Sequence, residues 1–513
     1  RTPHEWWWRG PTDAQQWWGV WGRSKMISQT TPTKLPPPVE HGPPRSRQRR
    51  RGVSVLLAMW SVVIAALTAT SIQLVSFRQA HLGHEVLQRT QARWAARAGV
   101  ESVIAALSWD ATTPEPTDAF SVFRELRLAS VGQTENASWD IRHHREGMDF
   151  GEPLDEHARL NINDEQNLGL LFPLFEEPMP GMNRDMSEDQ YAALRDWIDE
   201  DDEPTMFGAE SDYYDANYNY SPRNEPLRSI TEMELVAGMW PDYVRGEDWD
   251  LDGRLDPNEN DGDKSPPEDD ADGWLDGAWA GWLTVTSVAD GVTDSGLPRL
   301  RLQYCDLGDL QDRIGITPEQ AQALQNWSRG SDDLHLTDLQ IQSLSSLAGG
   351  SATGQAQGQA QGQNQNTPNV TQLDLEEEQI LAVISECTLF PAYEKRPGPI
   401  NINTVSESLL IALFRAQQLE ETDAQQLIFM RNAMAEGVTD LARTVDESMG
   451  NSGPTGQLAN QTRQWLLRSL DTRSNVFRIS SIGTSEVSGL EQEIICLVDR
   501  STIPVRIIEY REP

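Results

Sequence analysis

The sequence predicts an α+β protein with a long N-terminal helix, an antiparallel β-sheet and a large inserted domain that is mainly helical. The first observation is an uncharged, mostly apolar run from Val53 to Val75 that follows a basic leader. The second is a helical spacing of apolar residues that continues beyond this run. The third is a set of strand-like stretches near residue 140 and at the C-terminus, with helical patterns between them.

The apolar run is long enough to cross a membrane. About 20 helical residues span the ~30 Å hydrocarbon core of a bilayer. Five arginines lie between Arg45 and Arg51, and basic flanks tend to stay in the cytoplasm. We therefore expect one membrane pass, with the N-terminus in the cytoplasm and everything after Phe77 on the far side.

The junction Arg51-Gly52-Val53 separates the basic leader from the apolar run. A plain signal anchor and a cleaved secretory signal are two interpretations, but a secretory signal has a shorter apolar core and ends in small residues. A glycine at this junction resembles the cleavage site of a type IV prepilin, where a peptidase on the cytoplasmic side cuts after the glycine. This interpretation predicts processing between Gly52 and Val53, with the apolar segment retained.

Residues 1–52 are predicted to be a cytoplasmic leader without regular structure. The chain begins with Arg1, and its first methionine is Met26. We therefore expect residues 1–25 not to be translated. A tryptophan-rich cytoplasmic tail is the alternative interpretation of this segment.

Residues 53–110 are predicted to form a single helix, first membrane-spanning and then amphipathic. After the apolar run, apolar residues recur mainly three or four positions apart, which is typical of a helix with one buried face. Helix-forming residues fill the segment, with Gly83 and Gly99 as its weak points. Pro114 and Pro116 prevent much extension.

Strand-like stretches near both ends of the remaining chain predict one antiparallel sheet. The alternation of apolar residues in Ala137–His143 is typical of a half-buried strand. Gly483 and Gly489 are expected to mark the turn after the first C-terminal strand. The other predicted strands are Arg159–Ile162, Val476–Ile482, Glu491–Asp499 and Pro504–Tyr510.

Residues 164–470 are predicted to be a helical insertion between the first strands, in residues 111–163, and the last strands, in residues 471–513. The motif Leu160–Asp164 returns as Ile400–Thr404, and a helical pattern follows each copy. The Asn-Asp or Asn-Thr at the end of the motif suits a helix N-cap. The predicted helices are Ser187–Ile198, Ser406–Leu413 and Thr422–Arg431, and a third, degenerate copy of the unit is expected at Cys305–Trp327.

Residues 349–369 are rich in glutamine and glycine and are predicted to form a flexible linker, because they offer little to bury. The three cysteines, Cys305, Cys387 and Cys496, allow at most one internal disulfide. Their spacing does not identify the pair.

The chain is strongly acidic, with a formal net charge of −37. From Asp196 to Asp276 there are 26 acidic residues and 5 basic ones, so this stretch supplies 21 of the excess negative charges. Such a chain does not bind nucleic acid through a general basic surface. The density indicates either a solvated face or a set of cation sites.

Within the acidic region 246–280, residues 248–259 fit the twelve-residue calcium loop of EF-hand proteins. Carboxylates occupy positions 1, 3, 5, 9 and 12, and glycine occupies position 6, where the turn is sharpest. A solvated, Asp-rich loop is the alternative, and residues 260–270 contain two prolines and do not predict the helix that follows an EF-hand loop. A weaker echo of the pattern lies at Asp270–Asp276. The predicted Ca2+ ligands are Asp248, Asp250, Asp252, Arg254 through its carbonyl, Asp256 and Glu259.

Catalytic motifs are absent from the sequence, so we expect no enzymatic activity. The chain contains no H-E-x-x-H pair, no G-x-S-x-G elbow and no P-loop. His143, His144 and His157 lie near predicted strand ends and are expected to be surface residues and not metal ligands.

An ordered set of motifs resembles the type II secretion system minor pseudopilin K family, also called general secretion pathway protein K. The resemblance covers residues 45 to about 245 and 398 to the end, and residues 246–396 do not match the family pattern. The motifs are Arg51-Gly52-Val53, Asp155-Glu156, Arg159 to Asn163, Leu194 to Pro204, Gly208-Ala209-Glu210, Tyr213-Tyr214, Asn224 to Leu227, Ile400 to Thr404 and the terminal strands.

The resemblance implies a pilin-like core, a single-pass inner-membrane location with a periplasmic bulk, and cleavage by prepilin peptidase. It also implies I-type and J-type minor pseudopilins as partners and a role at the pseudopilus tip in the export of folded proteins. With Val53 as the first mature residue, the fifth is Leu57. Most pilin-like subunits carry glutamate there, which neutralises the amino group of the preceding subunit. A subunit without it is suited to be the first in the filament.

The resemblance also implies a second calcium site, because members of this family bind calcium in the helical domain. The candidate lies after the predicted helix Ser187–Ile198. Carboxylates crowded together without a cation raise one another's pKa values, and a solvated loop is the alternative. The candidate ligands are Asp199, Asp201, Asp202, Glu203 and Glu210.

Two other functions fit parts of the sequence. Asn401–Arg431 resembles helix-hairpin-helix modules that bind DNA, as in competence proteins, but its link lacks glycine and carries Glu420 and Glu421. We therefore expect no nucleic-acid partner. A membrane-anchored, calcium-binding scaffold or adhesin would show the same anchor and loop, but it would not require the Gly52 junction or the terminal strands.

Overall fold

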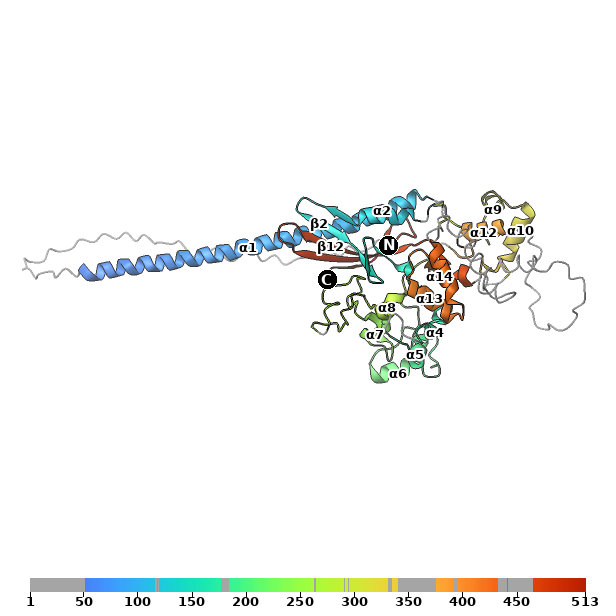
Figure 1. The fold of residues 1–513 in the computed structure, drawn as a ribbon, viewed down its shortest axis with the longest axis horizontal. Coiled ribbons are helices and arrows are strands. Elements are labelled where there is room, and N and C mark those ends of the chain that lie inside the picture. Colours follow the sequence, from blue (N-terminus) through green and yellow to red (C-terminus); the bar gives the residue numbers. More distant parts are fainter. Residues whose placement is uncertain are drawn as a thin grey trace, which may run out of the picture. The chain divides into compact units, whose positions relative to one another are not determined.

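The structure is a computed structural model, shown as a ribbon in Figure 1. It describes residues 51–115, 118, 120–176, 184–262, 264–289, 291–293, 295–330, 335–339, 375–391, 395–431, 441 and 465–513. Residues 1–50 of the predicted leader and the predicted linker 349–369 lie outside these ranges. The chain divides into two compact parts, Arg1–Phe77 and Arg78–Pro513.

Helix α1 runs without interruption from Arg51 to Thr112. This confirms the single helix predicted over residues 53–110, and Gly83 and Gly99 do not break it. Every side chain from Val53 to Phe77 is exposed and none is charged. In the part of the chain that the structure describes, α1 is the one helix long and apolar enough to cross a membrane.

The main sheet is antiparallel and has the strand order β1-β2-β12-β13-β14, with β5 also paired to β12. The three predicted C-terminal strands are confirmed. The predicted strand Ala137–His143 is divided, because His143 begins a separate hairpin of β3 (His143–Arg145) and β4 (Met148–Phe150). The strands of the main sheet are β1 (Val131–Gln133), β2 (Ala137–Ile141), β5 (Leu154–Asp155), β12 (Val476–Ser485), β13 (Glu491–Asp499) and β14 (Arg506–Arg511).

The C-terminal half of α1 and helix α2 (Ser121–Ala129) pack on this sheet. Val100, Val103 and Leu107 of α1 share one buried core with strand residues such as Ile479. Their spacing of three and four residues places them on one helix face. The predicted antiparallel sheet is therefore confirmed, and it packs against the long N-terminal helix.

Gly483 allows α1 to approach the sheet closely. A Cβ on this residue would lie 1.9 Å from the backbone oxygen of Ala92. The prediction that Gly483 lies in a turn is wrong, since it lies inside β12, which extends to Ser485. Gly489 does lie in the turn, with a φ of +70°.

The described residues of the insertion form three units, each closed by a short parallel strand pair. β6 (Leu160–Asn161) pairs with β7 (Leu283–Thr284), β8 (Leu300–Arg301) pairs with β9 (Cys387–Thr388), and β10 (Ile400–Asn401) pairs with β11 (Leu470–Asp471). The predicted repeat and its third copy are thus confirmed.

The predicted strand Arg159–Ile162 belongs to the first of these units and not to the main sheet. Its described pairing is with β7, and the N–H of Ile162 donates to the carbonyl of Thr284 at 3.0 Å. The partner strand β7 lies more than a hundred residues further along the chain. The local pattern around a two-residue strand therefore could not identify it.

Helices fill the space between the paired strands, and the predicted ones are confirmed within a few residues. Ser187 caps α5 in a capping box with Gln190, as its position before two acids suggested. The described helical elements are η1 (Glu156–Ala158), α3 (Glu165–Leu168), α4 (Leu171–Leu174), α5 (Glu188–Ile198), α6 (Ser211–Asn217), η2 (Ile230–Leu235), α7 (Pro241–Arg245), α8 (Ala278–Trp282), α9 (Leu307–Ile314), α10 (Pro318–Trp327), α12 (Glu377–Glu386), α13 (Glu407–Ala416) and α14 (Glu421–Met430).

The first and third units share one hydrophobic core, whereas the second unit has its own. Trp197 and Trp279 of the first unit and Phe414 of the third belong to the shared core. The separate core of the second unit includes Leu310 and Leu324. The second unit, which the family pattern does not cover, is therefore packed around side chains of its own.

Replacing Gly483 by alanine is expected to lower the free energy of unfolding by about 1–3 kcal/mol, the usual cost of overpacking a tight contact. The added Cβ would meet the α1 backbone, so α1 or β12 must shift. Thermal unfolding of the full chain in detergent measures the effect. The control is Gly151→Ala, where a Cβ meets nothing within 4 Å. Equal unfolding midpoints for the two variants would contradict the close approach of α1 to β12.

Candidate cation sites and membrane segment

The acidic loop Asp248–Glu259 folds back on itself and buries three of its carboxylates. Asp248, Asp252 and Glu259 are 4%, 2% and 3% exposed. The backbone turns sharply through positive φ angles at Leu251 and Gly253, and glycine adopts such angles without strain. Ligand oxygens of Asp248, Asp250 and Glu259 lie within 4.8 Å of one another. The loop therefore brings three of the predicted ligands together.

Asp252 groups with Asp250 and with Glu493 of β13, again within 4.8 Å. The Ser480 hydroxyl of β12 contacts both Asp252, at 3.0 Å, and Glu493, at 2.6 Å. The sequence analysis missed Glu493, and no local pattern could have found it because it lies on a distant strand. The acidic loop is thus in contact with the main sheet.

Two predicted ligands lie outside these groups. The N–H of Asp256 donates to the Glu259 carboxylate at 3.1 Å. The carboxylate of Asp256 itself belongs to neither group. Arg254 was predicted to act through its carbonyl, and its guanidinium lies 3.9 Å from Asp140. The described residues of 260–270 form no helix, as the prolines predicted.

Burial raises the pKa of the carboxyl groups in this loop. The values are about 6 for Asp248, about 7 for Asp250, about 8 for Asp252 and about 9 for Glu259. Burial is the largest cause in each case, and neighbouring carboxylates raise the values further, with Glu493 acting on Asp252. At neutral pH these values keep Asp252 and Glu259 mainly protonated, and a nearby positive charge would favour their ionised forms.

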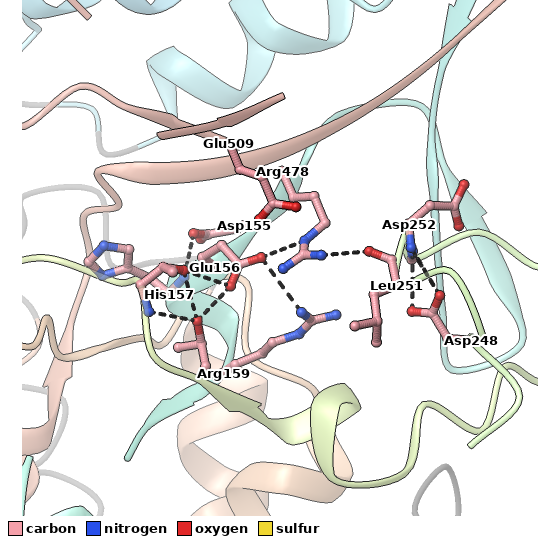
Figure 2. A network of polar contacts seen from close by, with 12 residues as sticks. Asp155, Glu156, His157, Arg159, Asp248, Leu251, Asp252, Arg478 and Glu509 are labelled. Carbon is pink, nitrogen blue, oxygen red and sulfur yellow. Dashed lines mark hydrogen bonds and ion pairs between the residues drawn. The ribbon is translucent and has the colours of Figure 1, made fainter. Parts of the chain in front are cut away.

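Arg478 of β12 holds the loop against the sheet. Arg478 donates from Nη1 to the carbonyl of Leu251 at 2.5 Å and from Nε to Glu156 at 2.8 Å. Arg159 lies 3.6 Å from the same Glu156 oxygen. Figure 2 shows Arg478 between Glu156 and Leu251. Burial alone would raise the pKa of Glu156, but the two arginines hold it at about 2, so this carboxylate is already compensated.

The second acidic cluster forms around Glu210. Ligand oxygens of Glu210, Asp199 and Asp196 lie within 4.8 Å of one another. Glu210 is 3% exposed, and neither of its carboxylate oxygens has a hydrogen-bond partner. One oxygen of Asp199 and the side-chain oxygen of Asn224 are also buried without a partner. Buried polar atoms normally find partners, so these oxygens are candidate ligand atoms.

The electrostatics of this cluster agree with its geometry. Burial, followed by repulsion from Asp196 and Asp199, raises the pKa of Glu210 to about 7. Burial also raises the pKa of Asp199, and Asp201 adds to the effect. A cation would remove both the repulsion and the unsatisfied lone pairs.

The cluster differs in membership from the predicted set. Asp196 replaces the exposed residues Asp201, Asp202 and Glu203, which do not converge with Glu210. Asp196, which the sequence analysis missed, lies inside α5 and not in the acidic segment after it. Gly208 packs so tightly against it that a Cβ there would lie 1.9 Å from the Asp196 carboxylate.

The weaker echo at Asp270–Asp276 lies beside Glu247. The N–H of Asp276 donates to the Glu247 carboxylate at 3.0 Å. Burial raises the pKa of Glu247 to about 7 and also raises the pKa of Asp276. Among the residues that the structure describes, these side chains form no group at ligand distance.

The histidines predicted to lie on the surface are partly buried, so that prediction is wrong for two of them. His143 and His157 are buried, and each Nδ1 contacts a backbone carbonyl at 2.9 Å, that of Glu152 and that of Pro399 respectively. Burial lowers the pKa of His143 to about 3. Their role is to pack the junction between hairpin, sheet and insertion.

The residues of the predicted processing site lie at the start of α1. Gly52 is part of this helix, and Val53 is exposed. Leu57 is 65% exposed, and the first acidic residue of α1 is Glu85. An apolar helix of this kind fits a single-pass membrane anchor, and cleavage after Gly52 stays a prediction.

The link between α13 and α14 carries an ion pair. Arg415 and Glu421 lie 2.7 Å apart across the link, and Gln418 adopts a φ of +57°. The acidic side chain therefore occupies the position next to the turn, where a DNA-binding hairpin would present its N–H groups to phosphate.

Comparison with known proteins identifies related chains. Residues 174–246 match the first domain of the family described as Type II secretion system (T2SS), protein K. Type II secretion system protein K of Klebsiella pneumoniae is 26% identical over 208 residues, which cover 37% of this chain and 59% of that protein. Its counterpart in Dickeya chrysanthemi is 26% identical over 239 residues, which cover 37% of this chain and 62% of that protein.

A solved structure also matches. It is the crystal structure of the GspK-GspI-GspJ complex from the enterotoxigenic Escherichia coli type 2 secretion system, with 14% identity and a TM-score of 0.39. The match covers 84% of this chain and 99% of the solved chain. The sequence matches confirm the predicted resemblance to protein K, and they span about three fifths of the length of the relatives.

Stability without added cation is expected to fall as the pH rises from 5 to 8. The loop carboxyls have folded-state pKa values of about 6 to 9, above the ordinary value of about 4. The folded state therefore binds more protons than the unfolded state in this window, and the free energy of unfolding decreases with pH. Melting curves of the full chain in detergent with EDTA should show a lower midpoint at pH 8.

Saturating Ca2+ should remove most of this difference. The cation binds the ionised carboxylates of the folded state and stabilises it by mass action. Equal midpoints at pH 5 and pH 8 in EDTA would mean that the loop carboxyls are not electrostatically strained. Mg2+ at the same ionic strength is the control for screening.

Proposed function

We propose that this chain is a minor pseudopilin of the type II protein secretion machinery, located at the pseudopilus tip, that aids the export of folded proteins across the outer membrane. The observation that carries the proposal is the course of α1. One uninterrupted helix includes the exposed apolar segment from Val53 to Phe77 and then packs on an antiparallel sheet. The match of residues 174–246 to protein K supports the choice of subunit type.

The proposed location is the inner membrane, with the N-terminus in the cytoplasm and the bulk of the chain in the periplasm. The arginines before α1 support this orientation, because basic flanks are retained in the cytoplasm. The role is mechanical and not enzymatic. It depends on assembly with other subunits, for which we propose I-type and J-type minor pseudopilins.

The tip position is supported by the chemistry of the membrane segment. After processing at Gly52 the new amino group of Val53 would be charged inside the membrane, where an uncompensated charge is costly. The positive charge of this amino group is compensated by a carboxylate of the subunit below. A subunit above does not compensate it. Leu57 offers none, and the first acid of α1 is Glu85. A chain of this kind therefore offers no carboxylate to a subunit above it, which suits the first position in the filament.

Calcium is the proposed cofactor at two positions. The loop site uses Asp248, Asp250 and Glu259, whose oxygens converge, and the chemistry of clustered carboxylates suits Ca2+. The second site uses Asp196, Asp199 and Glu210, where Glu210 has both oxygens unpartnered. Bound cations at these positions would fix the first unit to the sheet and fix the end of α5.

The mature N-terminus is expected to be Val53. Prepilin peptidase should cut after Gly52 in cells that carry the secretion system, and N-terminal sequencing of the membrane-extracted chain measures this. Gly52→Val should leave the leader in place while the chain stays in the membrane, because the apolar segment is unchanged.

An uncleaved leader in the unaltered chain would favour the alternative of a membrane-anchored scaffold or adhesin. Co-purification with the I-type and J-type subunits tests the role itself. A correctly processed chain that purifies alone from cells containing both subunits would contradict the proposed tip complex.

Asp250→Ala and Glu210→Gln are each expected to remove one bound Ca2+, and the double variant to remove two. Each substitution removes a carboxylate oxygen from a different group, and the two groups share no ligand, so their effects should be independent. Calorimetric titration of the full chain in detergent gives the stoichiometry. Glu268→Ala, an exposed acid of the same region, is the control for net charge.

Without Ca2+, Glu210→Gln should raise the melting midpoint at pH 8, because it removes a buried, repelled carboxylate. With Ca2+ it should lower the midpoint relative to the unaltered chain. An unchanged stoichiometry in either single variant would refute the site concerned.

A further inference from the structure

The three cysteines are distributed unevenly between the cores of the fold. Cys387 is fully buried in the core of the second unit, and Cys305 packs against the same core. Cys496 lies on β13 and belongs to the core between α1 and the main sheet. All three are free thiols in the structure. Two of them therefore share one environment from which the third is excluded.

The short β8–β9 pair brings Cys387, the first residue of β9, near the turn after β8 that contains Cys305. Cys387 is the register partner of Leu300, and the N–H of Leu302 donates to the carbonyl of Thr388 at 3.0 Å. The chain then turns back, with the N–H of Cys305 donating to the carbonyl of Arg301 at 2.8 Å. The Cys305 thiol points back over this turn and contacts the carbonyl of Leu302 at 3.6 Å.

Electrostatics give an independent sign of their proximity. Burial is the main cause that raises the pKa of Cys387, and the Cys305 thiolate is the next. Its effect is larger than those of Glu386, the neighbouring residue, and of Arg313. After burial, Cys305 is therefore the largest influence on the pKa of Cys387.

We propose that Cys305 and Cys387 form a disulfide in the mature protein. The inference rests on the proposed function for its setting, because disulfides persist in the periplasm and are rare in the cytoplasm. The two thiols lose two protons and two electrons, and one S–S bond forms. An oxidised dithiol partner accepts the electrons by thiol–disulfide exchange and is reduced in turn.

The bond would act where the second unit is weakest. This unit has a small core of its own, and the return strand β9 is held to β8 by a two-residue pairing. The sequence between the two cysteines includes the glutamine- and glycine-rich residues 349–369. A cross-link that closes a long connection restricts the unfolded chain, so it stabilises the unit without adding apolar residues.

Peptide mapping of the purified full chain in detergent tests the pairing. The chain is incubated with oxidised glutathione, unfolded, alkylated and digested without reduction. The expected product is a linked peptide pair that contains Cys305 and Cys387, with Cys496 alkylated. Cys496→Ser should leave the linked pair unchanged, whereas Cys305→Ser should leave Cys387 alkylated. Melting of the second unit should occur at a higher temperature in the oxidised chain than after reduction.

Three alkylated cysteines in the oxidised, unaltered chain would overturn the proposal, as would a linked peptide that contains Cys496. Neither result depends on a variant that folds. The same mapping on chain extracted from cells separates this inference from the proposed function. A bond that forms in the purified chain, while both thiols stay free in cells, would overturn the disulfide in the mature protein. Processing after Gly52 in the same extracted chain would leave the proposed function standing.

Discussion

Two adjacent buried carboxylates, Asp155 and Glu156, connect the main sheet to the insertion. Glu156 binds Arg478 of β12 and accepts from the Thr284 hydroxyl of β7 at 2.6 Å. Asp155 accepts from Thr404 at 2.6 Å, just after β10. Two units and the sheet thus meet at two neighbouring side chains. Removing one partner of a buried ion pair costs about 3–5 kcal/mol of folding free energy. Arg478 pairs with Glu156 and also holds the acidic loop, so the position of the loop depends on this carboxylate as well.

Features that depend on local sequence were predictable. The apolar run from Val53 and the helical spacing of apolar residues after it determine α1, since both depend on local sequence alone. The terminal strands β12, β13 and β14 follow from alternation and β-branched residues. Ser187 was predicted to begin a helix because its cap uses only the next three residues. The repeated Asn motif indicated units, and the structure shows that each begins with a two-residue strand.

Features that depend on distant partners were not predictable. β6 was assigned to the wrong sheet because its pairing with β7 involves only two residues. Glu493 and Asp196 join the acidic clusters from a far strand and from inside a helix, where no spacing rule applies. Gly483 resembles a turn residue in the sequence, yet its role is to admit the backbone of α1. The sequence specifies the type of each residue, but the contacts of these residues depend on tertiary packing, which the sequence pattern does not show.

The contrast between the buried carboxylates of this protein explains why a cation is proposed for some and not for others. Glu156 is as buried as Glu259 and Glu210, but arginines lower its pKa to about 2, whereas the pKa values of the other two rise to about 9 and about 7. Protonation would remove the charge but would leave both Glu210 oxygens without partners. A divalent cation would supply charge and contacts together, which is why we propose one for these clusters and none for Glu156.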